Sequence, residues 1–149
     1  MQFIKNGPDV PEPLLQAHED GRVVFFCGAG ISYPAKLPGF GGLVSKLFDD
    51  LGVQPDAIQR SAINAGQLDT AIGLLENTYV GHRDVVRNAI AKILIPDLSA
   101  SNALETHEAL LTLGKKRDGK LRLITTNFDR LFEKVLEDQN LSVERLVMH

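Results

Sequence analysis

The feature that most constrains the fold is an apolar run that ends in a glycine turn. Residues 22–27 read RVVFFC, and Gly28, Ala29 and Gly30 follow directly. A short continuous run of β-branched and aromatic residues predicts a strand that is covered on both faces, as is usual in a parallel sheet. The glycine turn would then lie at the carboxyl end of that strand, where open α/β sheets bind ligands.

The same pattern occurs again near the end of the chain. Residues 120–125 (KLRLIT) predict a second strand, and the polar residues 126–129 (TNFD) form a turn. The helix that follows carries apolar residues on one face, namely Leu131, Phe132, Val135 and Leu136. Two units of strand, turn and helix predict an α/β, Rossmann-like fold with a largely parallel sheet.

Amphipathic helices are predicted between the two strands and before the first one. Apolar positions recur at helical spacing over residues 14–20, 40–51, 56–65, 68–79, 83–95 and 101–113. Gly21 and Gly52 are expected to end the first two of these helices. The helices within about 55–113 form a block that is inserted between the strands of one domain spanning residues 1–149.

Composition limits the kind of protein. A chain of 149 residues with 44% hydrophobic and 23% charged residues predicts one folded domain. The net charge of −3 argues against direct nucleic-acid binding. Cys27 is the only cysteine, which excludes an intrachain disulfide and a multi-cysteine zinc site, and we expect no metal. The sequence has neither a signal peptide nor a membrane-spanning run, so a cytoplasmic protein without a membrane partner is expected.

The first turn has the chemistry of a phosphate-binding site. Glycine permits positive φ, and its missing Cβ lets a ligand approach the backbone. Exposed amides there attract phosphate oxygens, so a nucleotide pyrophosphate is the expected ligand, with the Ser32 hydroxyl as a further hydrogen-bond donor. Tyr33 breaks a G-x-G-x-x-G pattern, and Lys36 followed by Leu37 does not fit a P-loop. A tight turn without any ligand is the alternative.

The second turn offers an amide and a carboxylate in alternate positions. Asn127 and Asp129 at a strand end can bind a ribose hydroxyl and a carboxamide. Capping of the following helix by Asn127 is the alternative, because asparagine commonly accepts hydrogen bonds from the first turn of a helix.

Three segments in this order, GAGIS (28–32), LPGF (37–40) and LITTNFD (123–129), resemble the sirtuin (Sir2) superfamily. Members of that family build an NAD-binding pocket from a GAGxS turn, a Pro-x-Phe loop and a strand-end Asn-x-Asp. The resemblance implies that NAD+ is bound by Gly28, Ala29, Gly30, Ile31, Ser32, Pro38, Phe40, Thr126, Asn127 and Asp129. Within this set it makes Asn127 the catalytic-site residue beside the nicotinamide ribose, and Asp129 the residue that holds the carboxamide.

Several departures point away from a protein-deacylating sirtuin. The four-cysteine zinc module is missing, and Gly39 and Gly41 stand where the family loop carries Asp and Arg. The helical block resembles instead the Sir2-like domains of bacterial antiphage defence systems, which hydrolyse NAD+ to nicotinamide and ADP-ribose. The resemblance therefore implies an NADase, a hydrolase with NAD+ as substrate and no zinc, that acts in antiviral defence by NAD+ depletion. It also implies a homo-oligomer and a partner protein such as a defence-system ATPase.

Two other functions stay open, namely an NAD-dependent protein deacylase and a non-catalytic NAD or ADP-ribose sensor or oligomerisation module. The family's catalytic histidine follows the Asn-x-Asp turn, and His149 is either that residue or an ordinary terminal one. His18, His82 and His107 are expected to be surface or structural residues. The family's later Gly-Ser or Gly-Thr turn is absent, so these residues resemble the front part of a longer Sir2-like domain. Whether the isolated 149-residue chain is active is left open.

Overall fold

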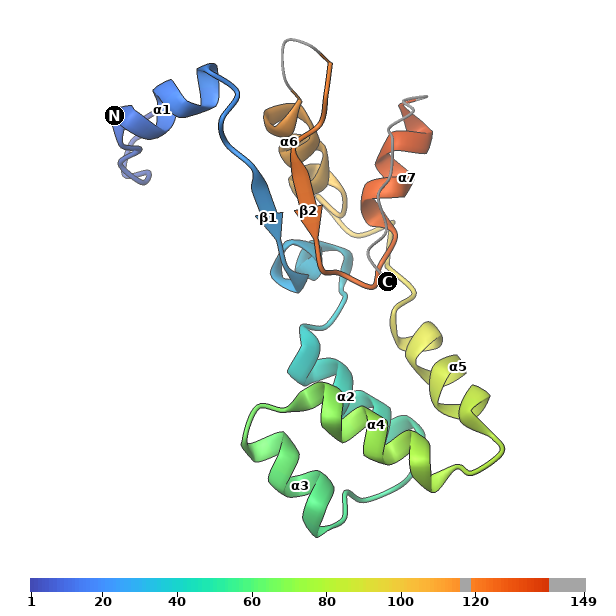
Figure 1. The fold of residues 1–149 in the computed structure, drawn as a ribbon. Coiled ribbons are helices and arrows are strands. Elements are labelled where there is room, and N and C mark those ends of the chain that lie inside the picture. Colours follow the sequence, from blue (N-terminus) through green and yellow to red (C-terminus); the bar gives the residue numbers. More distant parts are fainter. Residues whose placement is uncertain (116–118, 140–149) are drawn as a thin grey trace. The chain divides into compact units, whose positions relative to one another are not determined.

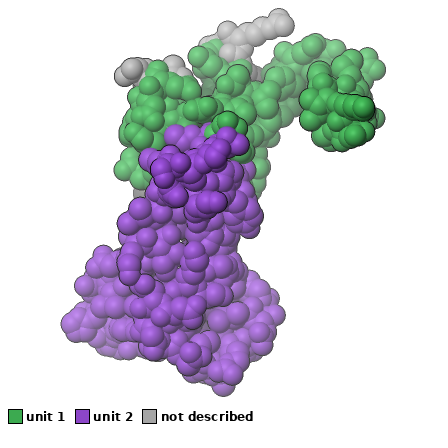
Figure 2. Space-filling view, turned by 180° about the vertical axis from the view of Figure 1, so that it is seen from behind, with its two compact units in different colours: residues 1–28, 105–126, 130–149 green, residues 29–104, 127–129 purple. Residues whose placement is uncertain are grey.

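The computed structural model describes residues 1–115 and 119–139, and it divides the chain into two compact units (Figures 1 and 2). Unit 1 comprises residues 1–28, 105–126 and 130–149, and unit 2 comprises residues 29–104 and 127–129. Both strands therefore belong to unit 1, whereas the turn after the second strand belongs to unit 2.

Unit 1 contains a small parallel sheet. Strands β1 (Phe25–Cys27) and β2 (Leu123–Thr125) pair in parallel, with Phe25 opposite Leu123 and Cys27 opposite Thr125 (Figure 1). The predicted mixture of helices with parallel strands is confirmed. Each strand is shorter than its predicted range, because the residues just before it do not form a regular ladder.

The prediction that the first strand is covered on both faces is wrong for the described residues. Burial alternates along the strand: Cys27 is buried, whereas Phe26 is 71% exposed. On β2, Ile124 is 43% exposed. Successive side chains of a strand point to opposite faces of the sheet, so one face packs inward and the other carries Phe26 and Ile124. In β1, therefore, a continuous apolar run does not mean that both faces of the strand are covered.

One helix packs against β2 through a glycine, which has no side chain at the contact. Helix α6 (Glu105–Gly114) contacts β2 and helix α7 (Leu131–Asp138). A Cβ on Gly114 would lie 3.1 Å from Leu121 Cδ1 and 3.5 Å from the Arg122 carbonyl oxygen. The Arg122 N–H donates to the Gly114 carbonyl at 2.9 Å. Glycine at position 114 thus lets the end of α6 approach the chain that enters β2.

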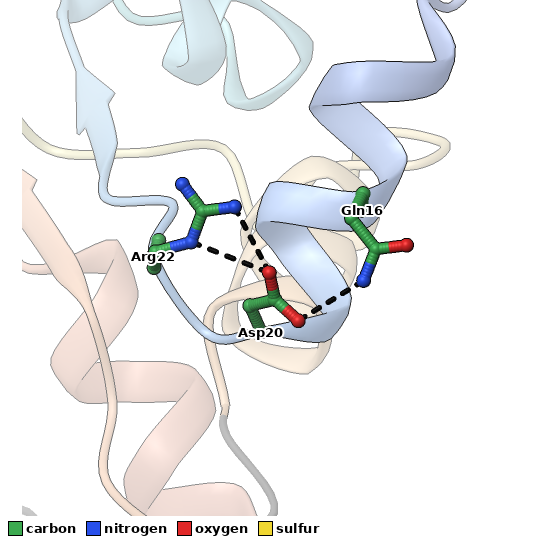
Figure 3. A network of polar contacts seen from close by, with 3 residues as sticks. All are labelled: Gln16, Asp20 and Arg22. Atoms are coloured by element: carbon green, nitrogen blue, oxygen red, sulfur yellow. Dashed lines mark hydrogen bonds and ion pairs between the residues drawn. The ribbon is translucent and has the colours of Figure 1, made fainter.

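Helix α1 (Glu12–Glu19) ends as the sequence predicts. Gly21 adopts a left-handed φ of 63°, and the Arg22 N–H donates to the Ala17 carbonyl at 2.8 Å. Asp20 accepts hydrogen bonds from Gln16 Nε2 at 3.0 Å and from Arg22 Nη2 at 2.9 Å (Figure 3). These bonds hold the pKa of Asp20 below its ordinary value. The bond from Arg22 has the larger effect, and the bond from Gln16 has the next largest.

Unit 2 is a helical block with its own apolar core. It contains the 3-10 helix η1 (Ala29–Ala35) and helices α2 (Phe40–Asp50), α3 (Ala57–Asn64), α4 (Leu68–Thr78) and α5 (Arg83–Ile93). The core residues come from α2 to α5: Val44, Leu47, Phe48, Ala62, Ala71, Leu75, Val86 and Ala89. Most of them occupy the apolar stripes read from the sequence. Helical periodicity therefore predicted this block well.

Helix ends in unit 2 follow local chemistry. The Asp56 carboxylate accepts from the Ile58 and Gln59 N–H groups, each at 2.8 Å, and Gln59 Oε1 accepts from the Asp56 N–H at 2.9 Å. This reciprocal capping box starts α3. Gly52 has a φ of 65° and ends α2 as predicted. The predicted helix 101–113 begins only at Glu105, and α6 belongs to unit 1.

No helix in the described part of the chain combines the length and apolar character needed to cross a membrane.

Candidate functional site

Three polar side chains from distant parts of the chain meet in unit 2. Ser32 Oγ donates a hydrogen bond of 2.8 Å to Asp129 Oδ2, and Asn127 Nδ2 donates one of 3.2 Å to Ser32 Oγ. Ser32 is buried, and Asn127 and Asp129 are half-buried. We call these three residues the polar cluster. The sequence placed all three in one candidate site, and the structure brings them within hydrogen-bond distance.

The 3-10 helix η1 positions Ser32. The sequence predicted only a glycine turn here, and the structure instead coils Ala29–Ala35 into η1 with Pro34 inside it. Ser32 and Ala35 are buried on the same side, three residues apart, as expected for a helix with three residues per turn. The Ser32 hydroxyl has one hydrogen to donate, and it is directed to Asp129. The predicted contact of Ser32 with a phosphate stays a prediction.

Asn127 does not cap the helix that follows it. Helix α7 begins at Leu131 and its N-cap residue is Arg130, without a side-chain capping bond. The capping alternative for Asn127 is therefore wrong. The hydrogen bond from Asn127 to Ser32 orients its amide toward the polar cluster instead.

The glycine turn has a different geometry from the one expected. Neither Gly28 nor Gly30 has positive φ, unlike Gly21 and Gly52. Backbone strain is therefore not the reason for glycine at these two positions. Among the described residues, a Cβ on Gly28 would have no heavy atom within 4 Å, and one on Gly30 would have only Tyr33 Cε2 at 4.0 Å. Packing within the described residues therefore does not demand glycine at either position, and the predicted contact of this turn with a ligand stays a prediction.

The Pro-Gly-Phe loop leads into α2. Phe40 is the first residue of α2, and Gly39 is its N-cap residue. A Cβ on Gly39 would lie 2.7 Å from the Tyr33 hydroxyl oxygen, so any side chain at position 39 would displace Tyr33. Pro38 is half-buried.

Aromatic rings accompany the polar cluster. Phe128 lies between Asn127 and Asp129 in the sequence and is 72% exposed, and its ring centroid is 6.2 Å from that of Phe40. Tyr33 is exposed as well. Neither Phe128 nor Tyr33 was among the site residues predicted from the sequence. An aromatic residue between two polar residues of a strand-end turn was the available signal for Phe128.

The remaining predicted site residues occupy varied positions. Ile31 is half-buried within η1, next to Ser32. Thr126 is exposed, and its N–H donates to the Cys27 carbonyl at 3.2 Å within unit 1. His149 lies outside the described residues. Nothing in the described geometry tests the predicted contact of these residues with NAD+, so it stays a prediction for each.

The other three histidines lie far from the polar cluster in the sequence, and they differ in their surroundings. His107 is fully buried in unit 1, with its ring centroid 4.8 Å from that of Phe132 in an edge-on arrangement. His18 Nε2 donates to the Leu113 carbonyl at 2.8 Å. His82 is exposed at the N-cap of α5. Within residues 1–115 and 119–139, no group of three or more His, Cys, Asp or Glu side chains could hold a metal ion.

Comparisons with known proteins leave the family open. No protein-family description matches the chain, and no solved structure matches it. The chain is 36% identical over 130 residues to "Uncharacterized protein y4cA" of Sinorhizobium fredii (strain NBRC 101917 / NGR234). The match covers 87% of this chain but 10% of that relative, so the chain spans about a tenth of the relative's length.

Proposed function

We propose that this chain carries the front part of a Rossmann-like, Sir2-like NAD+ hydrolase site. The observation that carries the proposal is the polar cluster, in which Ser32 holds both Asn127 and Asp129. These are the serine of the GAGIS turn and the two polar residues of the NFD turn, the segments on which the resemblance to the sirtuin superfamily rests.

The proposed reaction breaks the bond between C1′ of the ribose and the pyridinium nitrogen. The bonding pair leaves with nitrogen and yields neutral nicotinamide, while a water oxygen bonds to C1′ and releases a proton to solvent. The products are nicotinamide and ADP-ribose. Because C1′ becomes cationic on the way, groups that are held in place beside the ribose lower the barrier without forming a covalent bond.

Each member of the polar cluster has a proposed task. Asn127 orients a ribose hydroxyl and the attacking water through its amide. Asp129 accepts a hydrogen bond from the carboxamide N–H of nicotinamide. Ser32 fixes the orientation of the Asn127 and Asp129 side chains through its hydroxyl. The backbone around Gly28 and Gly30 receives the pyrophosphate, with Ala29 and Ile31 in the same turn.

The wider setting is proposed from the same resemblance. NAD+ depletion in antiphage defence, a homo-oligomer and a partner protein such as a defence-system ATPase would suit such an enzyme. These features are proposed from the resemblance to the Sir2-like domains of defence systems and not from any contact in this chain.

The test is nicotinamide release from NAD+ by the complete protein, alone and with a neighbouring-gene partner. Asn127→Ala should lower the rate by about 100-fold or more, the typical cost of losing one fixed polar group at a reacting centre. Asn88→Ala, which changes an exposed residue of α5, is the matched control and should retain the rate. Thermal unfolding of both variants checks that the fold survives.

The other outcomes separate the alternatives. Release that requires an acyl-lysine peptide would identify a deacylase. Saturable NAD+ binding without release under any of these conditions would identify a sensor. Equal rates for wild type and Asn127→Ala would remove Asn127 from the catalytic site.

A further inference from the structure

The sheet of unit 1 leaves apolar side chains on one of its faces in solvent. Phe26 on β1 is 71% exposed, and its partner in the ladder, Ile124 on β2, is 43% exposed. Val24 is 48% exposed and lies two residues before Phe26, as expected for a residue on the same face of an extended chain. We call these three residues the open face. An exposed apolar group of this kind marks a surface where another element binds.

The margin of the open face is basic. Residues 22–27 and 120–126 contain three basic residues, one of them Arg122, and no acidic residue. Arg122 is exposed, lies two residues before Ile124, and makes no ion pair in the described part of the chain. An apolar surface with a positive margin is best covered by a segment that is both apolar and acidic.

The N-terminal arm, residues 1–19, has this character. Helix α1 buries none of its residues, and Phe3 and Leu14 are 66% and 48% exposed. Glu12 and Glu19 lie seven residues apart on α1, hence on the same side of the helix. Neither glutamate makes an ion pair within residues 1–115 and 119–139. The arm therefore offers exposed apolar side chains together with an acidic side.

The arm is held away from the open face of its own chain. His18 on α1 donates from Nε2 to the Leu113 carbonyl at 2.8 Å, and its ring meets that of Phe25 edge-on at a centroid distance of 6.3 Å. Phe25 and Phe26 are neighbours on β1, so their side chains point to opposite faces of the sheet. Because these contacts keep α1 on the Phe25 side, an arm that covers the open face belongs to another molecule.

We propose that the open face binds the N-terminal arm of a second copy of this chain. Apolar contact with Phe26 supplies affinity, and the glutamates of the arm opposite Arg122 supply orientation. The arm and the open face lie in the same unit, so two copies can each give an arm to the other and close a two-fold dimer. This goes beyond the proposed function, which takes a homo-oligomer from the resemblance alone and names no surface for it.

The experiment follows the mass of the complete protein by sedimentation velocity over a range of concentrations. The wild type should self-associate and dissociate on dilution. Phe26→Ala should weaken the association at least about tenfold, because both contacts lose an aromatic anchor. Arg122→Glu alone should weaken it by about tenfold or more, because like charges then face each other at both contacts. An arm variant with Glu12→Lys and Glu19→Lys should do the same for the same reason.

Mixing the Arg122→Glu variant with the arm variant tests the contact itself. In a mixed dimer the altered sheet of one chain meets the altered arm of the other, and the unaltered sheet meets the unaltered arm. Both contacts again pair opposite charges, so an affinity close to that of the wild type should return only in the mixture. Such a rescue also shows that both variants are folded, and it does not depend on NAD+.

The matched control is Lys46→Glu, which reverses an exposed charge on α2 in unit 2 and should keep the wild-type affinity. A wild type that is monomeric at every concentration would overturn the inference. An association that is unaffected by Phe26→Ala or Arg122→Glu would also overturn it, because a different surface would then hold the copies together. So would two charge variants that stay apart when they are mixed.

Discussion

The Ser32 hydroxyl donates a hydrogen bond of 2.8 Å to the Asp129 carboxylate across 97 residues of sequence. Ser32 also accepts a hydrogen bond of 3.2 Å from Asn127. One buried hydroxyl therefore ties the turn after the first strand to the turn after the second.

Ser32→Ala should destabilise the fold by about 1–3 kcal/mol, because it leaves half-buried polar groups without the hydroxyl. A double-mutant cycle with Asp129→Ala should give a coupling energy of about 0.5–3 kcal/mol. Urea unfolding provides these free energies. Ser45→Ala, which changes an exposed serine on α2, should have a negligible effect. Strict additivity of Ser32→Ala and Asp129→Ala would show that the bond contributes nothing.

Leu47→Ala should cost about 2–5 kcal/mol, since Leu47 is fully buried in the core of unit 2 and its truncation leaves a cavity. Ile58→Ala on α3 is the control: Ile58 is 68% exposed, so its loss should cost well under about 1 kcal/mol. Denaturant midpoints measure both. Similar costs for the two variants would contradict the helical packing described for unit 2.

Asp56→Ala should cost about 0.5–2 kcal/mol, because it removes the acceptor for two N–H groups at the start of α3. Asp49→Ala removes a carboxylate from the last turn of α2, where negative charge opposes the helix dipole. Its stability should be unchanged or slightly higher. Thermal unfolding measures both variants. A lower midpoint for Asp56→Ala but not for Asp49→Ala identifies a capping effect, whereas a similar loss in both would indicate a general effect of lost charge.

Burial raises the pKa of the Cys27 thiol above its ordinary value. The folded state therefore holds the thiol proton more tightly than the unfolded state. The stabilisation of the folded state by the buried neutral thiol is complete below the pKa of Cys27 in the unfolded chain. It is lost as the pH rises from that pKa through the higher pKa of Cys27 in the folded state. The free energy of unfolding of wild type minus that of Cys27→Ala should fall as the pH rises above about 8.5, the pKa of an unperturbed thiol. A constant difference would contradict the shift.

The same burial should protect Cys27 from alkylation. Cys27 is buried in unit 1, and the thiolate is the reactive form, so iodoacetamide should react slowly in native buffer and rapidly in denaturant. Mass spectrometry of the alkylated protein over time checks this. Equal rates in both conditions would contradict the burial of the thiol.

The helices were largely predictable because their signals are local. Apolar residues at helical spacing predicted the ranges of α2 to α5, and Gly21 and Gly52 ended helices as expected, with left-handed φ at both. The error at the start of α6 has a local cause too, because residues 101–104 form turns before the helix begins at Glu105.

The candidate site was predictable in part. Glycine, serine, asparagine and aspartate at strand ends identified Ser32, Asn127 and Asp129 without any knowledge of their contacts. The exposure of Phe128 and its ring contact with Phe40 were not predictable, because an apolar residue in a turn carries no periodic signal.

The sequence by itself determined the helical block, the two strand segments and the residue types at their ends, because each depends on neighbours within a few positions. Only the tertiary structure decided that Phe26 lies on an exposed face, that residues 29–35 coil into η1, and that Ser32 donates to Asp129. Burial and a hydrogen bond across 97 residues depend on which distant segments come together, and no local pattern of side chains specifies that.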